Sequence, residues 1–312
     1  MITSFNDLLP MLPLLIVTAT SVIAMMMIGI RRSYIATGSI TITGLLVATL
    51  VAVSMMDLTN QQVTPLLIID QYSLLFTVVV CASAMILAVL SFPYFLELDD
   101  QREEYFLLLT VATIGAIVMV SSNHFVSTVL GLETLSMSLY GMIAYPLHSA
   151  KSAKFPLEAS VKYLVLSAAA SGFILFGMAL IYAQTGTLSF SSVTNLPAAG
   201  LGDGYTIVAL LMVVSGMAFK LSLAPFHMWT PDVYEGAPLP ATAYLATIGK
   251  AAMFVVLLRF IQISDALSFD SIVIVLALIA VASMLAGNLL ALLQDNLKRI
   301  LAYSSIAHMG YL

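Results

Sequence analysis

Long apolar runs follow one another along almost the whole chain, and each has about the length that crosses a bilayer. A hydrocarbon layer of ~30 Å needs roughly 20 apolar residues in a helix. The sequence therefore predicts an all-α, polytopic bundle of transmembrane helices, nine of them complete and a tenth that begins near Leu297. The nine runs lie near 8–30, 34–56, 73–95, 105–121, 125–145, 159–184, 205–229, 241–261 and 271–293.

Composition agrees with a membrane protein and excludes most soluble functions. Of the 312 residues, 61% are hydrophobic and only 9% are charged, whereas about 25% of a soluble domain is charged. The 11 Lys and Arg against 16 Asp and Glu leave no basic surface for nucleic acid. A single cysteine, Cys81, is too few for an iron–sulfur cluster within the chain. We therefore expect one membrane domain, 1–312, in contact with lipid and without a metal or cofactor of its own.

The basic residues predict which way the bundle faces. Threading the runs alternately through the membrane puts only Arg259 on one side and eight Lys or Arg on the other. Because short loops rich in Lys and Arg stay in the cytoplasm, the N-terminus should lie outside it. The eight are Arg31, Arg32, Arg102, Lys151, Lys154, Lys162, Lys298 and Arg299.

The two remaining lysines fall at lipid depth. Lys250 lies near the middle of its run, where insertion of a lysine costs ~2.5–3.5 kcal/mol. Lys220 closely precedes Pro225, and a proline inside a helix removes a backbone donor and breaks the helix. A broken membrane helix persists only where protein or water satisfies its free carbonyls. The sequence therefore predicts a broken helix around Lys220–Pro225 beside a hydrated gap.

One carboxylate lies at comparable depth. Glu133 is followed by Ser136 and Tyr140 at i+3 and i+7, so the three share one helical face. An acid and two amines at lipid depth can relay protons, because their proton affinities depend on burial and on separation. The alternative is a salt bridge that joins helices without transport. Glu133, Lys220 and Lys250 are the leading relay candidates.

Three further features have weaker signals. Glu158 and Lys162 form an i, i+4 pair that is either a solvated helix end or a proton entry. His227 and Trp229 follow the break, as an interfacial anchor pair or with His227 on the proton path. The run 167–172 has the small residues of a close-packing face. Lys162 and His227 are therefore secondary candidates.

Five segments together resemble one known family, the antiporter-like membrane subunits of respiratory complex I. Within it they are most similar to subunit N of bacterial NADH–quinone oxidoreductase. The resemblance spans nearly the whole chain. Its segments are FKLSLAPFHMWTPDVYEGAP at 219–238, ATAYLATIGK at 241–250, GLETLSMSLYG at 131–141, VKYLVLSAAASGFILFGMALIYAQTG at 161–186 and LKRILAYSSIAHMGYL at 297–312.

The resemblance implies an architecture. Such subunits are similar in fold to cation/proton antiporters, with two inverted five-helix repeats that each hold a broken helix. By this likeness, 1–95 would form N-terminal helices, 105–261 the first repeat and 271–312 an incomplete second repeat. Family members continue for several helices and contain another buried ionisable residue proposed for proton exit. We therefore expect a truncated product or a fragment.

The resemblance also implies roles and partners. Glu133 would pair with Lys220, Lys250 would be the central relay lysine, and Lys162 and His227 would lie near the same hydrated axis. NADH, FMN, iron–sulfur clusters and quinone would belong to partner subunits in the bacterial inner membrane, while this chain moves protons. Two alternatives remain: a Na⁺ or K⁺/H⁺ antiporter or membrane-bound hydrogenase subunit of the same fold, and a structural spacer.

Overall fold

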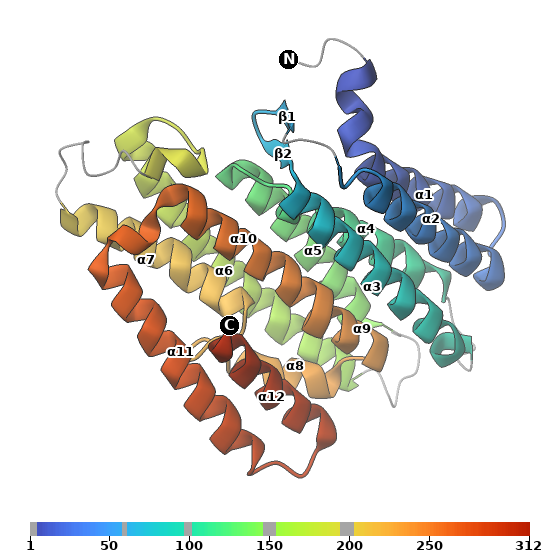
Figure 1. The fold of residues 1–312 in the computed structure, drawn as a ribbon. Helices are drawn as coiled ribbons and strands as arrows, with labels where there is room; N and C mark the ends of the chain where they lie inside the picture. The colour runs from blue at the N-terminus through green and yellow to red at the C-terminus, as the bar shows by residue number, and fades with distance from the viewer. Residues whose placement is uncertain (1–4, 58–60, 97–101, 146–153, 194–202) are drawn as a thin grey trace.

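The computed structural model describes residues 5–57, 61–96, 102–145, 154–193 and 203–312. Its long helices run side by side, with their connections gathered at two opposite ends of the bundle (Figure 1). Eight helices in these ranges are long and apolar enough to cross a membrane. The prediction of an all-α, polytopic bundle is confirmed. Eight spans are found in the described ranges where nine were expected, because the run 205–229 gives only a shorter apolar helix, Gly204–Lys220.

The long helices keep close to the expected apolar runs. They are α1 (Leu12–Ile30), α2 (Tyr34–Ser54), α3 (Gln71–Leu96), α4 (Glu103–Val120), α5 (Phe125–Ala144), α6 (Lys154–Thr185), α7 (Asp203–Lys220), α10 (Lys250–Ser264), α11 (Asp270–Ala291) and α12 (Leu297–Tyr311). The shorter elements are η1 (Phe5–Met11), α8 (Trp229–Gly236), α9 (Leu239–Tyr244), η3 (Leu245–Gly249) and η4 (Ala266–Ser268). Because α9, η3 and α10 are continuous, they form one span.

A small β-hairpin occupies the connection between α2 and α3 (Figure 1). Strand β1 (Gln61–Thr64) pairs antiparallel with β2 (Leu67–Ile69). Pro65 lies in the turn, and the Thr64 hydroxyl accepts hydrogen bonds from two backbone N–H groups that follow it. The apolar-run argument missed the hairpin because the hairpin lies between spans.

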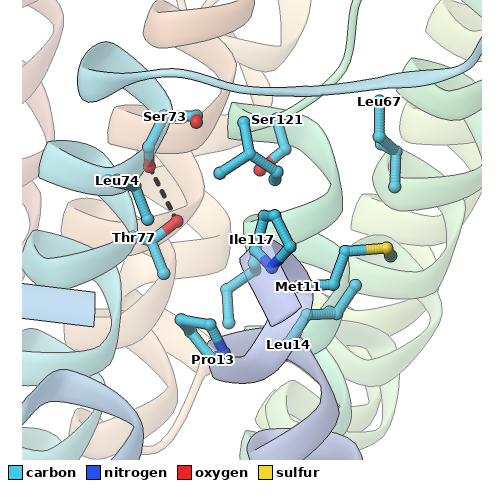
Figure 2. A pocket seen from close by; sticks show the side chains of 11 residues that line it. Met11, Pro13, Leu14, Leu67, Ser73, Leu74, Thr77, Ile117 and Ser121 are labelled. Atoms are coloured by element: carbon cyan, nitrogen blue, oxygen red, sulfur yellow. Dashed lines mark hydrogen bonds between the residues drawn. The ribbon is translucent and has the colours of Figure 1, made fainter. Parts of the chain in front are cut away.

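The N-terminal segment packs against the same end of the bundle. Met11, Pro13 and Leu14 line a pocket of about 10 Å³ together with residues of β2, α3 and α4 (Figure 2). The Thr77 hydroxyl in this pocket donates to the Ser73 carbonyl of its own helix at 2.7 Å. The lining is mostly apolar, so the pocket belongs to the packing of the first helices.

Helices α4 and α5 approach closely because glycines face each other across the contact. A Cβ at Gly115 would lie 2.7 Å from the Gly131 carbonyl oxygen, and a Cβ at Gly131 would lie 2.8 Å from the Gly115 carbonyl oxygen. Small residues let membrane helices come this near. This contact fixes the position of α5 two residues before Glu133.

Ion pairs occur at both ends of the bundle. Where α1 leads into α2, exposed Arg32 pairs with Glu104 at 3.0 Å. At the opposite end, buried Arg259 pairs with Asp70 at 2.8 Å. The basic residue Lys151 lies outside the described residues. The orientation of the bundle in the membrane stays a prediction.

Candidate functional site

Helix α7 ends at Lys220, well before the end of its apolar run. The Leu223 N–H donates to the Ala218 carbonyl at 2.9 Å, which closes the helix end in a Schellman-type turn. Ser222 holds the left-handed position of this turn with φ 63°, a conformation that costs a non-glycine residue about 1–2 kcal/mol. The predicted break is confirmed, and this turn forms it upstream of Pro225.

Neighbouring segments satisfy backbone groups that the break leaves free. The Ala224 N–H donates to the Ser283 hydroxyl of α11 at 2.8 Å. The Trp229 indole donates to the Phe219 carbonyl at 3.2 Å. A helix break within a membrane needs partners of this kind inside the protein.

The Lys220 amine lies where α5, α6 and α7 meet. Lys220 is 7% exposed. Its Nζ donates to the Ser136 hydroxyl on α5 at 3.1 Å and to the Ser167 hydroxyl on α6. The Tyr140 hydroxyl donates to the same Ser167 oxygen at 2.9 Å. The predicted polar face of α5 is confirmed as a face that contacts the buried lysine.

Close contact between α6 and α7 brings Lys220 to Ser167. A Cβ at Gly216, one turn before Lys220, would lie 2.8 Å from the Ala170 carbonyl oxygen. The small-residue face predicted on α6 is thus confirmed at Ala170. Gly172 was also assigned to that face, but a Cβ there would meet nothing within 4 Å, so Gly172 does not make the close contact.

Glu133 is partly buried on α5, and its carboxylate accepts a hydrogen bond from the Ser171 hydroxyl on α6. None of the ion pairs among the described residues joins Glu133 to Lys220. Glu133 nevertheless lies one helical turn from Ser136, the α5 residue that accepts a hydrogen bond from Lys220. The structure therefore gives the acid and the amine separate hydroxyl partners on α6, Ser171 and Ser167, where a direct pair was expected.

Lys250 is the first residue of α10 and follows the π-helical turn η3 directly. It is 3% exposed, and its Nζ donates to the Ser305 hydroxyl of α12 at 2.8 Å. The Nζ also lies 5.7 Å from the centroid of the Tyr234 ring, within the range of a cation–π interaction. Turns of the π type that interrupt α-helices are frequently found at functional sites. Both buried lysines thus lie beside a helix irregularity.

A small cavity lies between the two irregular segments. Its volume is about 10 Å³, close to the space that one water needs. Lys220 and Gly249, the residue before Lys250, both line it. The other lining residues are Met119, Leu132, Leu135, Ser136, Tyr163, Leu245 and Met253.

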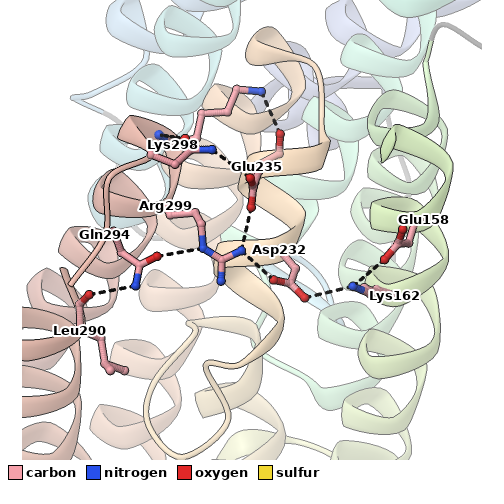
Figure 3. A network of polar contacts seen from close by, with 9 residues as sticks. Glu158, Lys162, Asp232, Glu235, Leu290, Gln294, Lys298 and Arg299 are labelled. Atoms are coloured by element: carbon pink, nitrogen blue, oxygen red, sulfur yellow. Dashed lines mark hydrogen bonds and ion pairs between the residues drawn. The ribbon is translucent and has the colours of Figure 1, made fainter. Parts of the chain in front are cut away.

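Lys162 belongs to a charged network that joins α6, α8 and α12 (Figure 3). It pairs with Glu158 at 2.8 Å, as its spacing predicts, and with Asp232 at 3.1 Å. Arg299 reaches Asp232 at 3.1 Å and Glu235 at 2.7 Å. Burial alone would raise the pKa of Asp232, but hydrogen bonds and charges from Lys162 and Arg299 outweigh it and hold that pKa below its ordinary value. Asp232 thus bridges two cations.

A polar pocket of about 210 Å³ opens beside this network. Glu158, Lys162, Asp232 and Glu235 line it together with residues of α6 and α8. The Lys162 and Asp232 side chains are both partly exposed. The pocket therefore offers titratable groups to solvent at the end of α6 where that helix begins.

His227 and Trp229 are both buried, which makes the interfacial-anchor interpretation wrong. The Trp229 ring stacks on Phe219 with centroids 5.6 Å apart and also contacts Tyr163. Neither ring nitrogen of His227 has a hydrogen-bond partner among the described residues. Within the same residues, His227 is bonded to neither Lys220 nor Lys250.

A sequence model of the family described as "NADH:quinone oxidoreductase/Mrp antiporter, TM" matches residues 122–312. This stretch is more than half of the chain and includes Glu133, Lys220 and Lys250. The chain belongs to this family. Helices α5 to α12 lie in the part that matches the antiporter family, and they supply the serines that contact both lysines.

Chains of three solved structures are similar to nearly the full length of this chain. A chain of respiratory complex I from Thermus thermophilus with bound aureothin is 33% identical, with TM-score 0.80 over 96% of this chain and 62% of that one. A chain of an archaeal membrane-bound sulfane sulfur reductase is 26% identical, with TM-score 0.80 over 97% and 62%. A chain of the Mrp complex from a Dietzia species shares the fold at 20% identity, with TM-score 0.84 over 99% and 58%. This chain thus spans 58% to 62% of their lengths.

Sequence reasoning does not find several residues of the candidate site. Ser305 contacts Lys250 from 55 positions away, and Asp232 contacts Lys162 from 70 positions away. Ser167 and Ser171 were interpreted only as packing residues, although they lie at i, i+4 on one helical face. That spacing was the one available signal for a shared polar role.

Proposed function

We propose that this chain is a proton-translocating membrane subunit of a bacterial NADH–quinone oxidoreductase, of the subunit N type. The observation that carries the proposal is the pair of buried amines, Lys220 and Lys250, each beside a helix irregularity and each bonded to serine on a neighbouring helix. The 33% identity to a complex I chain supports the choice of complex.

The interaction energy between the charges of Glu133 and Lys220 is of the size that proton transport requires. At an effective permittivity of ~20, two unit charges attract by ~4 kcal/mol at ~4 Å and by ~2 kcal/mol at ~8 Å. Moving one proton against ~100 mV requires ~2.3 kcal/mol. A displacement of Glu133 relative to Lys220 by a few ångströms therefore changes their interaction by about the required work.

In this proposal protons enter at the polar pocket beside Lys162 and Asp232, then reach Glu133 and Lys220, and later Lys250. His227 is a secondary candidate, because its buried ring nitrogens lack partners in the described part of the chain. The pocket end faces the cytoplasm and the N-terminus the periplasm. NADH, FMN, iron–sulfur clusters and quinone act in partner subunits, and this chain handles protons alone.

The test uses the complete complex reconstituted in lipid vesicles. Replacement of Lys220 or Lys250 by alanine should leave NADH oxidation running while fewer protons are pumped per electron pair. Arg32→Ala is the matched control, because this cation lies in an exposed pair at the bundle surface. Normal pumping in both lysine variants would reject the proposal.

A cation/proton antiporter is the second candidate. The family description names the Mrp antiporter beside NADH:quinone oxidoreductase. Sodium-dependent proton movement in vesicles without NADH would favour this function. Full pumping by a variant in which Glu133, Lys220 and Lys250 are all neutralised would instead indicate a structural spacer.

A further inference from the structure

We propose that Ser167 and Ser171 are positioning residues that hold Glu133 and Lys220 as a pair separated by hydroxyls. This inference rests on the proposed function, because it assigns a role within the same relay. It changes the interpretation of the small residues on α6 from packing alone to control of the distance between two charges.

The two serines provide separate partners for the two charged groups. They are four residues apart on α6, so they lie on one face about 6 Å apart along the helix axis. The Ser171 hydroxyl donates to Glu133 Oε1, and the Ser167 hydroxyl accepts from Lys220 Nζ. Each charged group thus has its own serine partner on α6, and the two groups do not form a direct ion pair.

The Lys220 amine has hydrogen-bond partners on two helices, α5 and α6. Ser167 accepts from Tyr140 as well as from Lys220, which uses both acceptor positions of its hydroxyl oxygen. Ser136 on α5 accepts a second hydrogen bond from the amine at 3.1 Å. Ser136 and Ser167 are fully buried. The amine therefore has hydroxyl partners that can hold it whether or not Glu133 approaches.

Loss of the Ser171 hydroxyl should collapse the separation. Among the described residues, Ser171 is the side chain that bonds the Glu133 carboxylate, and Glu133 lies one helical turn from Ser136, which bonds Lys220. A freed carboxylate in an apolar bundle turns to the nearest cation. A direct Glu133–Lys220 pair would then form and remain closed, so the pair could no longer open and close during transport.

The experiment compares serine variants in the full complex in vesicles. Ser171→Ala should lower the number of protons pumped per electron pair, because the Glu133 carboxylate loses its hydrogen-bond donor. It should also change the pH profile of pumping and shift the carboxylate infrared bands of Glu133, isolated by subtraction of the Glu133→Gln spectrum. Ser171→Thr keeps a hydroxyl and should restore pumping and bands. Ser167→Ala should lower pumping in the same way.

Ser138→Ala is the matched control. Ser138 is a buried serine of α5 whose hydroxyl bonds the Thr134 carbonyl of its own helix at 2.8 Å. If Ser171→Ala and Ser167→Ala behave like this control while Lys220→Ala loses pumping, the positioning role is overturned and the proposed function stands.

Two further outcomes are covered by the same set of variants. If Lys220→Ala and Lys250→Ala both pump normally, the proposed function fails, and the Glu133 infrared bands in Ser171→Ala still report whether the serine holds the carboxylate. If Ser171→Ala does not assemble, Ser171→Cys replaces it with a weak donor of similar size. A band shift in Ser171→Cys then supports the proposal, and unchanged bands overturn it.

Discussion

Lys250 donates a hydrogen bond of 2.8 Å to the Ser305 hydroxyl, from the start of α10 to the middle of α12. Within the described ranges, none of the ion pairs gives this buried amine a carboxylate partner. Ser305→Ala should therefore impair pumping while electron transfer continues, since a hydrogen bond to a charged group contributes about 1.5–3 kcal/mol. Proton uptake by vesicles measures the loss. The neighbouring Ser304→Ala is the control, and equal pumping in both variants would contradict the prediction.

Gly216→Ala should disturb the Lys220 site from one helical turn away. The new Cβ would lie 2.8 Å from the Ala170 carbonyl oxygen, so α7 must move away from α6. Overpacking of this kind costs about 1–3 kcal/mol and should draw Lys220 from Ser167. Lower heat stability and lower pumping are expected together. Gly172→Ala on α6 meets open space and should be neutral or slightly stabilising.

Arg259→Ala should destabilise the bundle far more than removal of an exposed arginine. Arg259 is 4% exposed, and its partner Asp70 also accepts a hydrogen bond from the Ser73 N–H at the start of α3. Breaking a buried pair costs about 3–5 kcal/mol because one charge is left unpaired. Arg32→Ala removes an exposed pair and should cost less than ~1 kcal/mol. The two variants are compared by their heat-denaturation midpoints, measured in detergent at one scan rate. Similar midpoints for Arg259→Ala and Arg32→Ala would contradict the prediction.

Asp232 should make the charged network sensitive to acid. Its pKa is lowered because Lys162 and Arg299 outweigh the effect of burial. A carboxylate of this kind stabilises the folded state above its unfolded pKa of about 3.9, and the contribution disappears as the pH falls through the folded value. The stability difference between wild type and Asp232→Asn should be constant from about pH 8 to pH 5 and shrink below about pH 4. Because these side chains are partly exposed, the difference should stay under ~1 kcal/mol. A difference that grows in acid would contradict this assignment.

The spans and the break could be predicted because each depends on residues close together in the chain. Apolar length predicts the helices, and Pro225 prevents α7 from continuing through its whole run. Glu158 and Lys162 also pair locally, at four residues' distance. Such features need no knowledge of how the helices meet.

The hydroxyl partners of the charged groups could not be predicted in the same way. Ser171 reaches Glu133 from another helix, and this contact depends on which helix faces meet. Which faces meet depends on where the helix backbones approach closely, as they do at Gly216 and Ala170. The left-handed Ser222 is likewise an exception to the preference for glycine, and only the surrounding packing can hold it.

The early end of α7 supplies an electrostatic partner that cannot be titrated. Lys220 lies in the last turn of the helix, where aligned peptide dipoles leave about half a negative elementary charge. A cation there is stabilised by about 0.3–1 kcal/mol, and by up to ~2 kcal/mol when partly buried. A carboxylate loses its charge when it takes up a proton, but a peptide dipole keeps its sign at every stage of transport. The interruption of α7 therefore gives Lys220 a constant background attraction, against which the variable charge of Glu133 can act.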